Sequence, residues 1–202
     1  MKLKETLTTK INLYLDRLDP ELSAVRTIAR TFLKERCSIE PDGTVRIFHK
    51  HDLGAENFAI VLFPAADAQW LRNPENRYIP DSYRSILASI NGLFVFDFRL
   101  FGLTPSMQRP SPRLDRSKLQ CPDLGLANID WIRQFQLAEQ LFYFGGRTIS
   151  FEENVGYFLL ENGRIQSIRR SGEVLKEWPD FPEFLNEELS SALRFANPSI
   201  AS

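Results

Sequence analysis

The chain has 202 residues, and its acidic and basic residues nearly cancel to a formal net charge of −1. This length suits one large domain and allows a core that needs neither disulfides nor metals. The near-neutral balance gives no global attraction to nucleic acid or to an anionic membrane, so neither is an expected partner. The sequence contains no apolar run of 18 residues, which argues against a membrane-spanning helix.

The two cysteines, Cys37 and Cys121, lie far apart in the sequence. Neither belongs to a disulfide framework or to a motif for a nucleophile or a metal site. The first residues also lack the apolar stretch of a secretory signal peptide. We therefore expect a cytoplasmic protein in which both cysteines are structural thiols.

The first 76 residues are expected to form two helices and two strands. Apolar residues recur at steps of three and four before and after Asp19-Pro20, which interrupts the pattern. Pro41-Asp42-Gly43 indicates a turn, and no linker rich in Pro, Gly or Ser separates this region from Tyr78, so we expect it to pack on the core. The predicted elements are helices over residues 3–18 and 22–33 and strands over residues 44–49 and 58–63.

The next segment predicts a helix followed by one long strand. Pro80 begins the helix, and Asn91-Gly92 ends it because both residues tolerate the left-handed backbone conformation. Strict alternation then predicts a single strand over residues 93–101 with one apolar face. That face is expected to hold Phe94, Phe96, Phe98 and Leu100.

Residues 104–127 contain four prolines and a group of basic residues, and they predict an exposed loop. The cations could contact a few phosphates, but no aromatic residue is interleaved for base stacking. A solvated loop is therefore the better interpretation. The basic residues are Arg109, Arg113, Arg116 and Lys118.

The last third predicts a short helix, several strands and a closing helix. Asn162-Gly163 is a strong hairpin signal, and Asp180 precedes Glu183 by three residues in a capping-box arrangement. Gly145-Gly146 is expected to form a turn between strands. The predicted elements are a helix over residues 129–140, strands over 141–144, 155–160, 164–169 and 173–178, and a helix from 181 to about 195 followed by a frayed tail (196–202).

Catalytic and metal-binding patterns are sparse. His49 and His51 would share one face of a strand, but no further ligands complete a metal site, so surface positions are favoured. Glu152 and Glu153 would point to opposite faces of a strand, which disfavours shared acid–base chemistry. No motif for nucleotide binding or for a nucleophilic hydrolase occurs. We expect no enzyme, metal or cofactor; an enzyme whose site is assembled from scattered residues remains a remote alternative.

Several short motifs over residues 77–195 resemble, in their order and spacing, the SUKH superfamily, the Smi/Knr-type domain. The family often has an acidic residue after the glycine of its middle hairpin. Here Gly156 is followed by Tyr157, which departs from that pattern. The residues that carry the resemblance are Tyr78, Pro80, Tyr83, Leu87, Asn91, Gly92, Phe101, Gly102, Ala127, Asn128, Trp131, Asn162, Gly163, Phe181, Phe184 and Leu185.

The resemblance implies a single α+β domain with an antiparallel or mixed sheet flanked by helices and no active site. Residues 1–76 would be an N-terminal elaboration packed on the SUKH-like core. Bacterial members are widely taken to be immunity proteins that bind and neutralise a cognate toxin domain, and eukaryotic members act as regulatory adaptors. The leading hypothesis is therefore a toxin-neutralising immunity protein, and the alternative is a regulatory or scaffold adaptor of the same fold. The motif residues are interpreted as architectural.

Residues 150–202 hold nine acidic and five basic residues, a local charge of −4. Many toxin domains are nucleases with basic clefts, and an acidic surface would steer toward such a cleft. The predicted partner contact is therefore the acidic face of the closing helix, at Glu183, Glu187 and Glu188. Carboxylates that merely solvate the helix are the competing interpretation.

Overall fold

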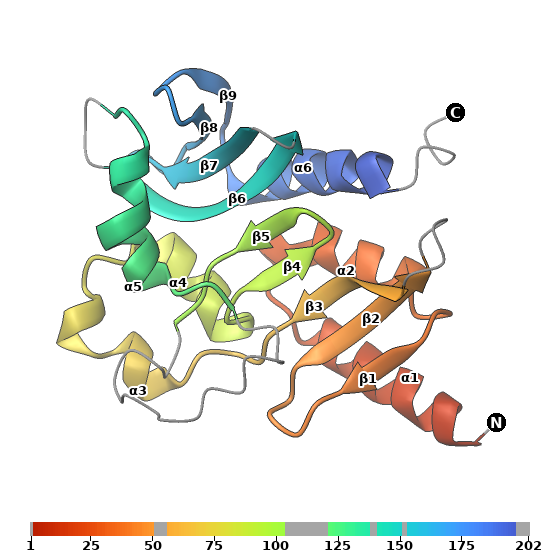
Figure 1. Cartoon of the computed structure of the whole chain (residues 1–202). Coiled ribbons are helices and arrows are strands. Elements are labelled where there is room, and N and C mark those ends of the chain that lie inside the picture. The colour runs from red at the N-terminus through yellow and green to blue at the C-terminus, as the bar shows by residue number, and fades with distance from the viewer. Residues whose placement is uncertain (1, 51–55, 104–120, 138–140, 151–152, 197–202) are drawn as a thin grey trace, which may run out of the picture.

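The computed structural model describes residues 2–50, 56–103, 121–137, 141–150 and 153–196 (Figure 1). In this part of the chain nine strands form one antiparallel sheet, and their order in the sheet is their order in the sequence. The fold is a single α+β domain, as the sequence predicts. The strands are β1 (Cys37–Ile39), β2 (Val45–Lys50), β3 (Glu56–Leu62), β4 (Leu93–Val95), β5 (Phe98–Leu100), β6 (Phe142–Ser150), β7 (Glu153–Leu159), β8 (Ile165–Arg169) and β9 (Val174–Trp178).

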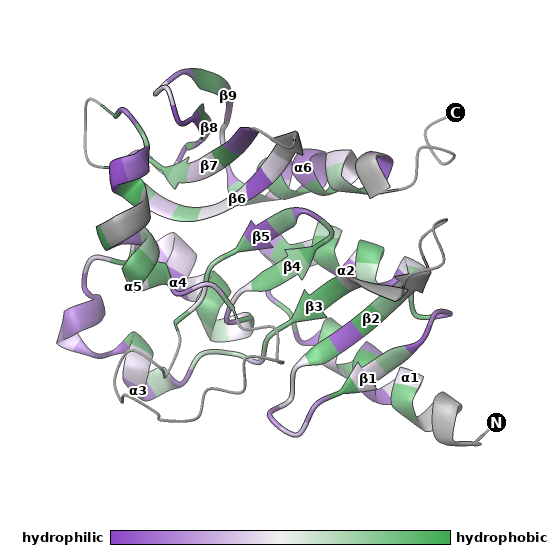
Figure 2. Ribbon diagram, in the orientation of Figure 1, coloured by the Kyte–Doolittle hydropathy of each residue, from purple (hydrophilic) through white to green (hydrophobic). Residues whose placement is uncertain are grey.

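Three long helices share one apolar core with the inner side of this sheet. They are α1 (Lys2–Asp16), α2 (Ser23–Thr31) and α6 (Phe181–Ala196), and α4 (Asp81–Ser89) contributes Tyr83, Ile86 and Leu87 to the same core. Figure 2 shows the apolar residues concentrated on the central strands β3 and β4. The predicted helices near the two ends of the chain are confirmed within a few residues, because their apolar periodicity needs a core to cover it.

The first 76 residues belong to the same sheet and core as the rest of the chain. The strand β3 pairs with β4 through Leu62 and Leu93, and α2 packs against α6. The ring of Phe32, just after α2, meets that of Phe96 edge-on at 5.7 Å. This region also contains β1, which pairs with β2 across the predicted turn and which the sequence patterns missed.

The prediction of one strand over residues 93–101 is wrong. The segment is a hairpin, with β4 and β5 joined by Phe96 and Asp97, and Phe96 has a backbone φ of 53°. Val95 pairs directly with Phe98, so the two residues, three apart in sequence, point to the same side of the sheet. A two-residue turn therefore shifts the alternation by one position. The buried residues of the two strands are Leu93, Val95, Phe98 and Leu100, and Phe101 after β5 is buried too, whereas Phe94 and Phe96 are half-buried.

The interpretation of Gly145-Gly146 as a turn is also wrong, because both residues lie inside the long strand β6. The register with β7 shifts at Gly145, which indicates a bulge. A Cβ atom would lie 2.6 Å from the carbonyl oxygen of Arg99 at Gly145 and 2.7 Å from that of Val155 at Gly146. The glycines thus allow the neighbouring strands to approach closely, which is a known use of glycine in strands.

The helix predicted over residues 129–140 is shorter and begins earlier. Asp123 caps the turn α5 (Leu124–Leu126) by accepting a hydrogen bond from the Leu126 N–H at 2.9 Å. A π-type turn, η4 (Ala127–Trp131), and a 3₁₀ turn, η5 (Ile132–Gln134), follow. The Gln136 N–H then donates to the carbonyl of Arg170 instead of continuing the helix.

Candidate functional site

Several polar and aromatic motif residues hold neighbouring elements together. The buried Tyr83 hydroxyl donates to the Phe101 carbonyl at 2.6 Å. Asn91 makes two hydrogen bonds to the backbone of Leu103, at 2.6 and 2.7 Å. Asn128 donates to the Tyr143 carbonyl at 2.7 Å and accepts from its N–H at 2.9 Å, which ties η4 to β6. These contacts give the side chains a structural role.

The remaining motif residues occupy turns, caps and the core. Pro80 is the N-cap of α4, and Gly163 has a positive φ in the β7–β8 hairpin. A Cβ atom added at Gly102 would lie 2.2 Å from the backbone carbonyl oxygen of Asn91. Trp131 is the last residue of η4. Leu87, Phe184 and Leu185 are fully buried.

Among the described residues, Cys37, Cys121 and Glu153 do not form a shared catalytic or metal site. Cys121 is buried, and burial raises the pKa of its thiol far above the usual range, so it is not an activated nucleophile. Cys37 is half-buried. Glu153 forms an ion pair with Arg169 at 2.5 Å. Within the described ranges no group of three His, Cys, Asp or Glu side chains could hold a metal ion.

Part of the predicted chemistry lies outside the described residues. His49 is in β2, but His51 and Glu152 fall outside, as do residues 104–120 with the four basic residues of the predicted loop. The prediction of an exposed loop is wrong for residues 121–127, where Cys121, Leu124 and Ala127 are buried and α5 begins.

The three carboxylates predicted as a partner contact do not share one exposed surface. Glu183 is exposed in the first turn of α6. Glu187 accepts hydrogen bonds from Lys176 and, at 3.0 Å, from the indole nitrogen of Trp178. Glu188 is directed inward, where it accepts from Tyr157 and pairs with Arg147. A partner contact at Glu183 stays a prediction, whereas the other two carboxylates have internal partners.

A different surface gathers exposed apolar side chains. An apolar hollow of about 410 Å³ is formed where the segment before α4 meets η4 and the start of β6. Tyr78, with 42% of its surface exposed, and Ile129, with 57%, line it, and the exposed Leu126 follows the lining residue Gly125. Its lining residues are Glu75, Tyr78, Gly125, Asn128, Ile129, Leu141 and Phe142.

The apolar hollow rests on the aromatic core. The Phe142 ring lies 6.3 Å from that of Tyr78 and 5.5 Å from that of the buried Tyr83. Burial, together with the nearby carboxylate of Asp123, raises the pKa of Tyr78 to about 12. Its hydroxyl therefore stays protonated at neutral pH and can donate a hydrogen bond.

The apolar hollow joins three segments that are distant in the sequence, so local patterns could not reveal it. Tyr78 drew attention only through the SUKH-like motif. Ile129 lies at the start of the helix predicted over residues 129–140, and the structure places it, exposed, in the π-type turn η4.

Comparison with protein-family models, with the curated proteins and with the solved structures found no match for this chain. The resemblance to the SUKH superfamily thus rests on the motif residues alone. Among the described residues, no helix combines the length and the apolar character needed to cross a bilayer.

Proposed function

We propose that this protein is a non-catalytic binding protein whose partner is another protein, docked at the apolar hollow. The observation that carries the proposal is the exposure of Tyr78 and Ile129 around a concave surface with Phe142 at its base. Exposed apolar side chains grouped on one surface mark interaction sites, and aromatic anchors in pockets dominate binding energies.

The polar groups of the apolar hollow favour a protein over a small substrate. Asn128 already uses its amide in hydrogen bonds to Leu124 and Tyr143, so it is not poised to orient a ligand. Sites for small molecules instead combine an apolar wall with several convergent polar groups. The acidic Glu75 lines this hollow and Asp123 lies near Tyr78, so a partner with an apolar side chain beside a basic one would be complementary.

A toxin domain is the partner that the SUKH resemblance supports, with neutralisation by occlusion in the cytoplasm as the activity. A basic toxin surface would suit the acidic rim of the apolar hollow and the exposed Glu183. A regulatory adaptor of the same fold would use the same hollow, and the identity of the partner distinguishes the two roles.

The test is affinity capture from the native host with the wild-type chain, Ile129→Asp and Leu13→Asp. Leu13 is 54% exposed on α1 and is a matched control for placing a charge on an exposed apolar position. The true partner is expected to be retained by the wild type and by Leu13→Asp and lost by Ile129→Asp. Binding should then be measured with the purified partner, where Ile129→Asp is expected to weaken the affinity at least tenfold, since hot-spot changes exceed about 2 kcal/mol.

Growth assays then identify the role of the partner. A toxin should inhibit growth when expressed alone and lose this effect when the wild-type chain, but not Ile129→Asp, is co-expressed. A partner that is harmless alone would favour the adaptor. Circular dichroism should first confirm that Ile129→Asp is folded. If this variant then binds the purified partner as tightly as the wild type, the apolar hollow is not the docking site.

A further inference from the structure

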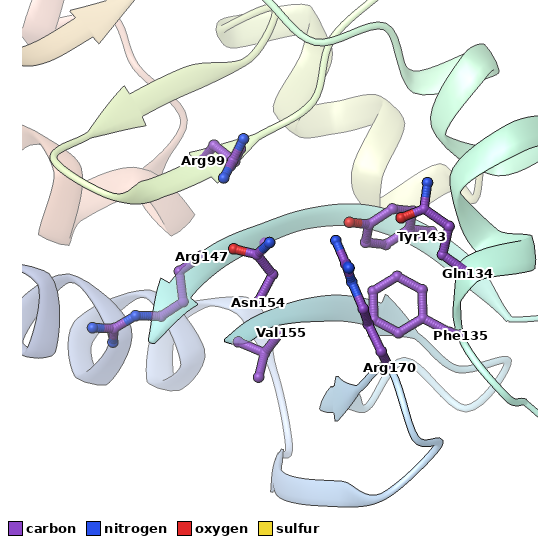
Figure 3. A pocket seen from close by; sticks show the side chains of 9 residues that line it. Arg99, Gln134, Phe135, Tyr143, Arg147, Asn154, Val155 and Arg170 are labelled. Atoms are coloured by element: carbon purple, nitrogen blue, oxygen red, sulfur yellow. The ribbon is translucent and has the colours of Figure 1, made fainter. Parts of the chain in front are cut away.

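A second hollow, of about 280 Å³, lies on the side of the sheet opposite α6 (Figure 3). Phe98 and Leu100, which flank Arg99 on β5, are buried in the core. Arg99 therefore points to the opposite side of the sheet. On β6 the ring of Phe144 packs against Phe184 of α6, so Tyr143 likewise faces away from that helix. This second hollow is called the arginine hollow below; it is also lined by Gln134, Asn154 and Arg170.

The floor of the arginine hollow is built from packed rings and a glycine. The Tyr143 ring stacks on Phe158 at 4.9 Å and meets Phe135 edge-on at 5.3 Å. Gly146 lines the hollow without a side chain, and a Cβ atom there would lie 3.5 Å from the Tyr143 hydroxyl. Gly146, besides its close contact with β7, thus leaves this space open beside a firmly held tyrosine.

The two arginines that point into the arginine hollow form no ion pair with the residues that the structure describes. Arg99 makes one long hydrogen bond, 3.5 Å, to the Thr148 hydroxyl, and within the described part of the chain neither Arg99 nor Arg170 forms an ion pair. Figure 3 shows Arg170 beside Tyr143 and Asn154, with Arg99 reaching in from the neighbouring strand.

Three described carboxylates on neighbouring elements are paired with other arginines. Asp97 and Glu188 bind Arg147, and Glu153 binds Arg169. Figure 3 shows the guanidinium of Arg147 pointing away from the arginine hollow. None of the lining residues that the structure describes is acidic. Within the described residues no carboxylate forms an ion pair with Arg99 or Arg170, and a bound anion would supply the balancing charge.

The remaining polar groups are also suited to an anion. The Thr148 hydroxyl donates to the side-chain oxygen of Asn154 at 2.9 Å, which leaves the amide nitrogen of Asn154 as a donor. Burial raises the pKa of Tyr143 to about 12, so its hydroxyl remains a donor at neutral pH. Together with the two guanidinium groups, these donors match a ligand that offers several acceptor oxygens within a small volume.

We propose that the arginine hollow binds a small phosphorylated ligand, with Arg99 and Arg170 clamping the phosphoryl oxygens and Asn154 and the Tyr143 hydroxyl donating to them. Planar guanidinium groups bind phosphate oxygens in bidentate fashion, and several of them impose geometry on a tetrahedral anion. The volume is too small for a protein segment and fits one or two phosphoryl groups with a small substituent. This binding site is separate from the apolar hollow and does not depend on the proposed protein partner.

The experiment titrates the full chain with inorganic pyrophosphate and inorganic phosphate, by calorimetry at constant ionic strength, with succinate as a carboxylate probe. The variants are Arg99→Gln, Arg170→Gln and Asn154→Asp, which places a negative charge in the hollow. Arg17→Gln, which removes an exposed arginine from the end of α1, is the matched control. Pyrophosphate is expected to bind with a 1:1 stoichiometry, and each variant in the hollow is expected to weaken it at least tenfold, while Arg17→Gln changes it less than twofold.

A readout that needs no variant follows the arginine side-chain Nε–H signals by nuclear magnetic resonance during the titration. The signals of Arg99 and Arg170 should shift with pyrophosphate at the concentrations that calorimetry reports. The proposal is overturned if pyrophosphate and phosphate do not bind, if succinate binds as tightly as they do, or if Arg17→Gln weakens binding as much as the variants in the hollow.

Discussion

Arg147 and Glu188 form an ion pair of 3.3 Å that joins β6 to α6, and only 12% and 13% of their side-chain surfaces are exposed. Asp97, in the β4–β5 turn, lies 3.2 Å from the same guanidinium, and Tyr157 donates its hydroxyl to Glu188. Desolvation by burial raises the pKa of Asp97, while the charge of Arg147 opposes the shift. One arginine therefore holds two nearly buried carboxylates between three elements of the fold.

Replacing Arg147 with methionine should destabilise the protein by about 3 kcal/mol, because removal of one member of a buried charge cluster leaves the others without compensation. Chemical denaturation followed by circular dichroism measures the change. The matched control is Arg164→Met, since Arg164 pairs with Glu177 at 2.5 Å but is 53% exposed. Exposed pairs contribute less than about 1 kcal/mol, so the control should change little. Equal losses in the two variants would show that burial of the cluster has no energetic consequence.

Gly92 and Gly163 provide a second matched pair, since both have a positive φ, of 90° and 83°. At Gly163 a Cβ atom would meet nothing within 4 Å, so Gly163→Ala should cost only the backbone strain, roughly 1 to 2 kcal/mol. At Gly92 the same atom would lie 2.1 Å from Cys121 Sγ and 3.0 Å from the Leu100 carbonyl oxygen. Gly92→Ala should therefore cost about 3 kcal/mol or more, as strain and overpacking add.

A double-mutant cycle separates the two contributions at Gly92. Adding Cys121→Ala removes the sulfur atom in the way of the new methyl group but leaves the positive φ and the Leu100 carbonyl in place. The combined variant should be more stable than the sum of the single changes predicts, by an interaction energy of about 1 kcal/mol. If the losses of stability in the two single variants simply add in the double variant, a clash with the Cys121 thiol is not the cause of the cost of Gly92→Ala.

The N-terminal region should unfold together with the rest of the chain. Removing residues 1–70 would strip β1–β3 from the sheet, leave the pairing edge of β4 open and uncover the face of α6 that packs on α2. We expect one thermal transition for the full chain, coincident by near- and far-ultraviolet circular dichroism, and no cooperative transition for residues 71–202. A shortened chain that keeps the stability of the full one would show that the two regions fold independently.

The sequence predicted the elements whose periodicity is long enough to be unambiguous. The apolar faces of α1, α2, α4 and α6 and the Asn162-Gly163 hairpin agree with the structure because each depends on residues within a few positions. The β4–β5 hairpin was missed because Phe96 and Asp97 are not typical residues for a tight turn, and the phenylalanine adopts the left-handed conformation that usually favours glycine. Tertiary packing against Phe32 accompanies this conformation.

Surface sites were harder to predict than elements, for a physical reason. The acidic charge of the last third is a real feature of composition, but Lys176 and Arg147 engage two of the three chosen carboxylates within the fold. Strand alternation puts Arg99 on the face opposite Phe98 and Leu100, in agreement with the structure, yet its position in the same hollow as Arg170 depends on the pairing of β5 through β8. A glycine pair inside a run of strand-forming residues is the one local signal that could have indicated the bulge beside the arginine hollow.

Acid should abolish the stabilising effect of the Glu187 carboxylate. Hydrogen bonds from Lys176, first, and then from Trp178 lower the pKa of this carboxyl below its usual 4.5, against the opposing effect of desolvation. A lowered pKa in the folded state stabilises the protein above the unfolded-state pKa, and that stabilisation is lost as the pH falls through the folded-state value. Denaturation curves at pH 7 should therefore show a stability deficit for Glu187→Gln that shrinks below pH 4.5.

The control for this measurement is Glu161→Gln, which removes an exposed carboxylate in the β7–β8 turn that forms no ion pair among the described residues. Salt should reduce the deficit of Glu187→Gln, because the Lys176–Glu187 pair is nearly half exposed and therefore screened. The hydrogen bond from the buried Trp178 indole should keep part of the deficit in high salt, since a carboxylate accepts it more strongly than the neutral amide oxygen of glutamine does. If the deficit is the same at pH 3 as at pH 7, the carboxylate of Glu187 does not stabilise the junction between β9 and α6.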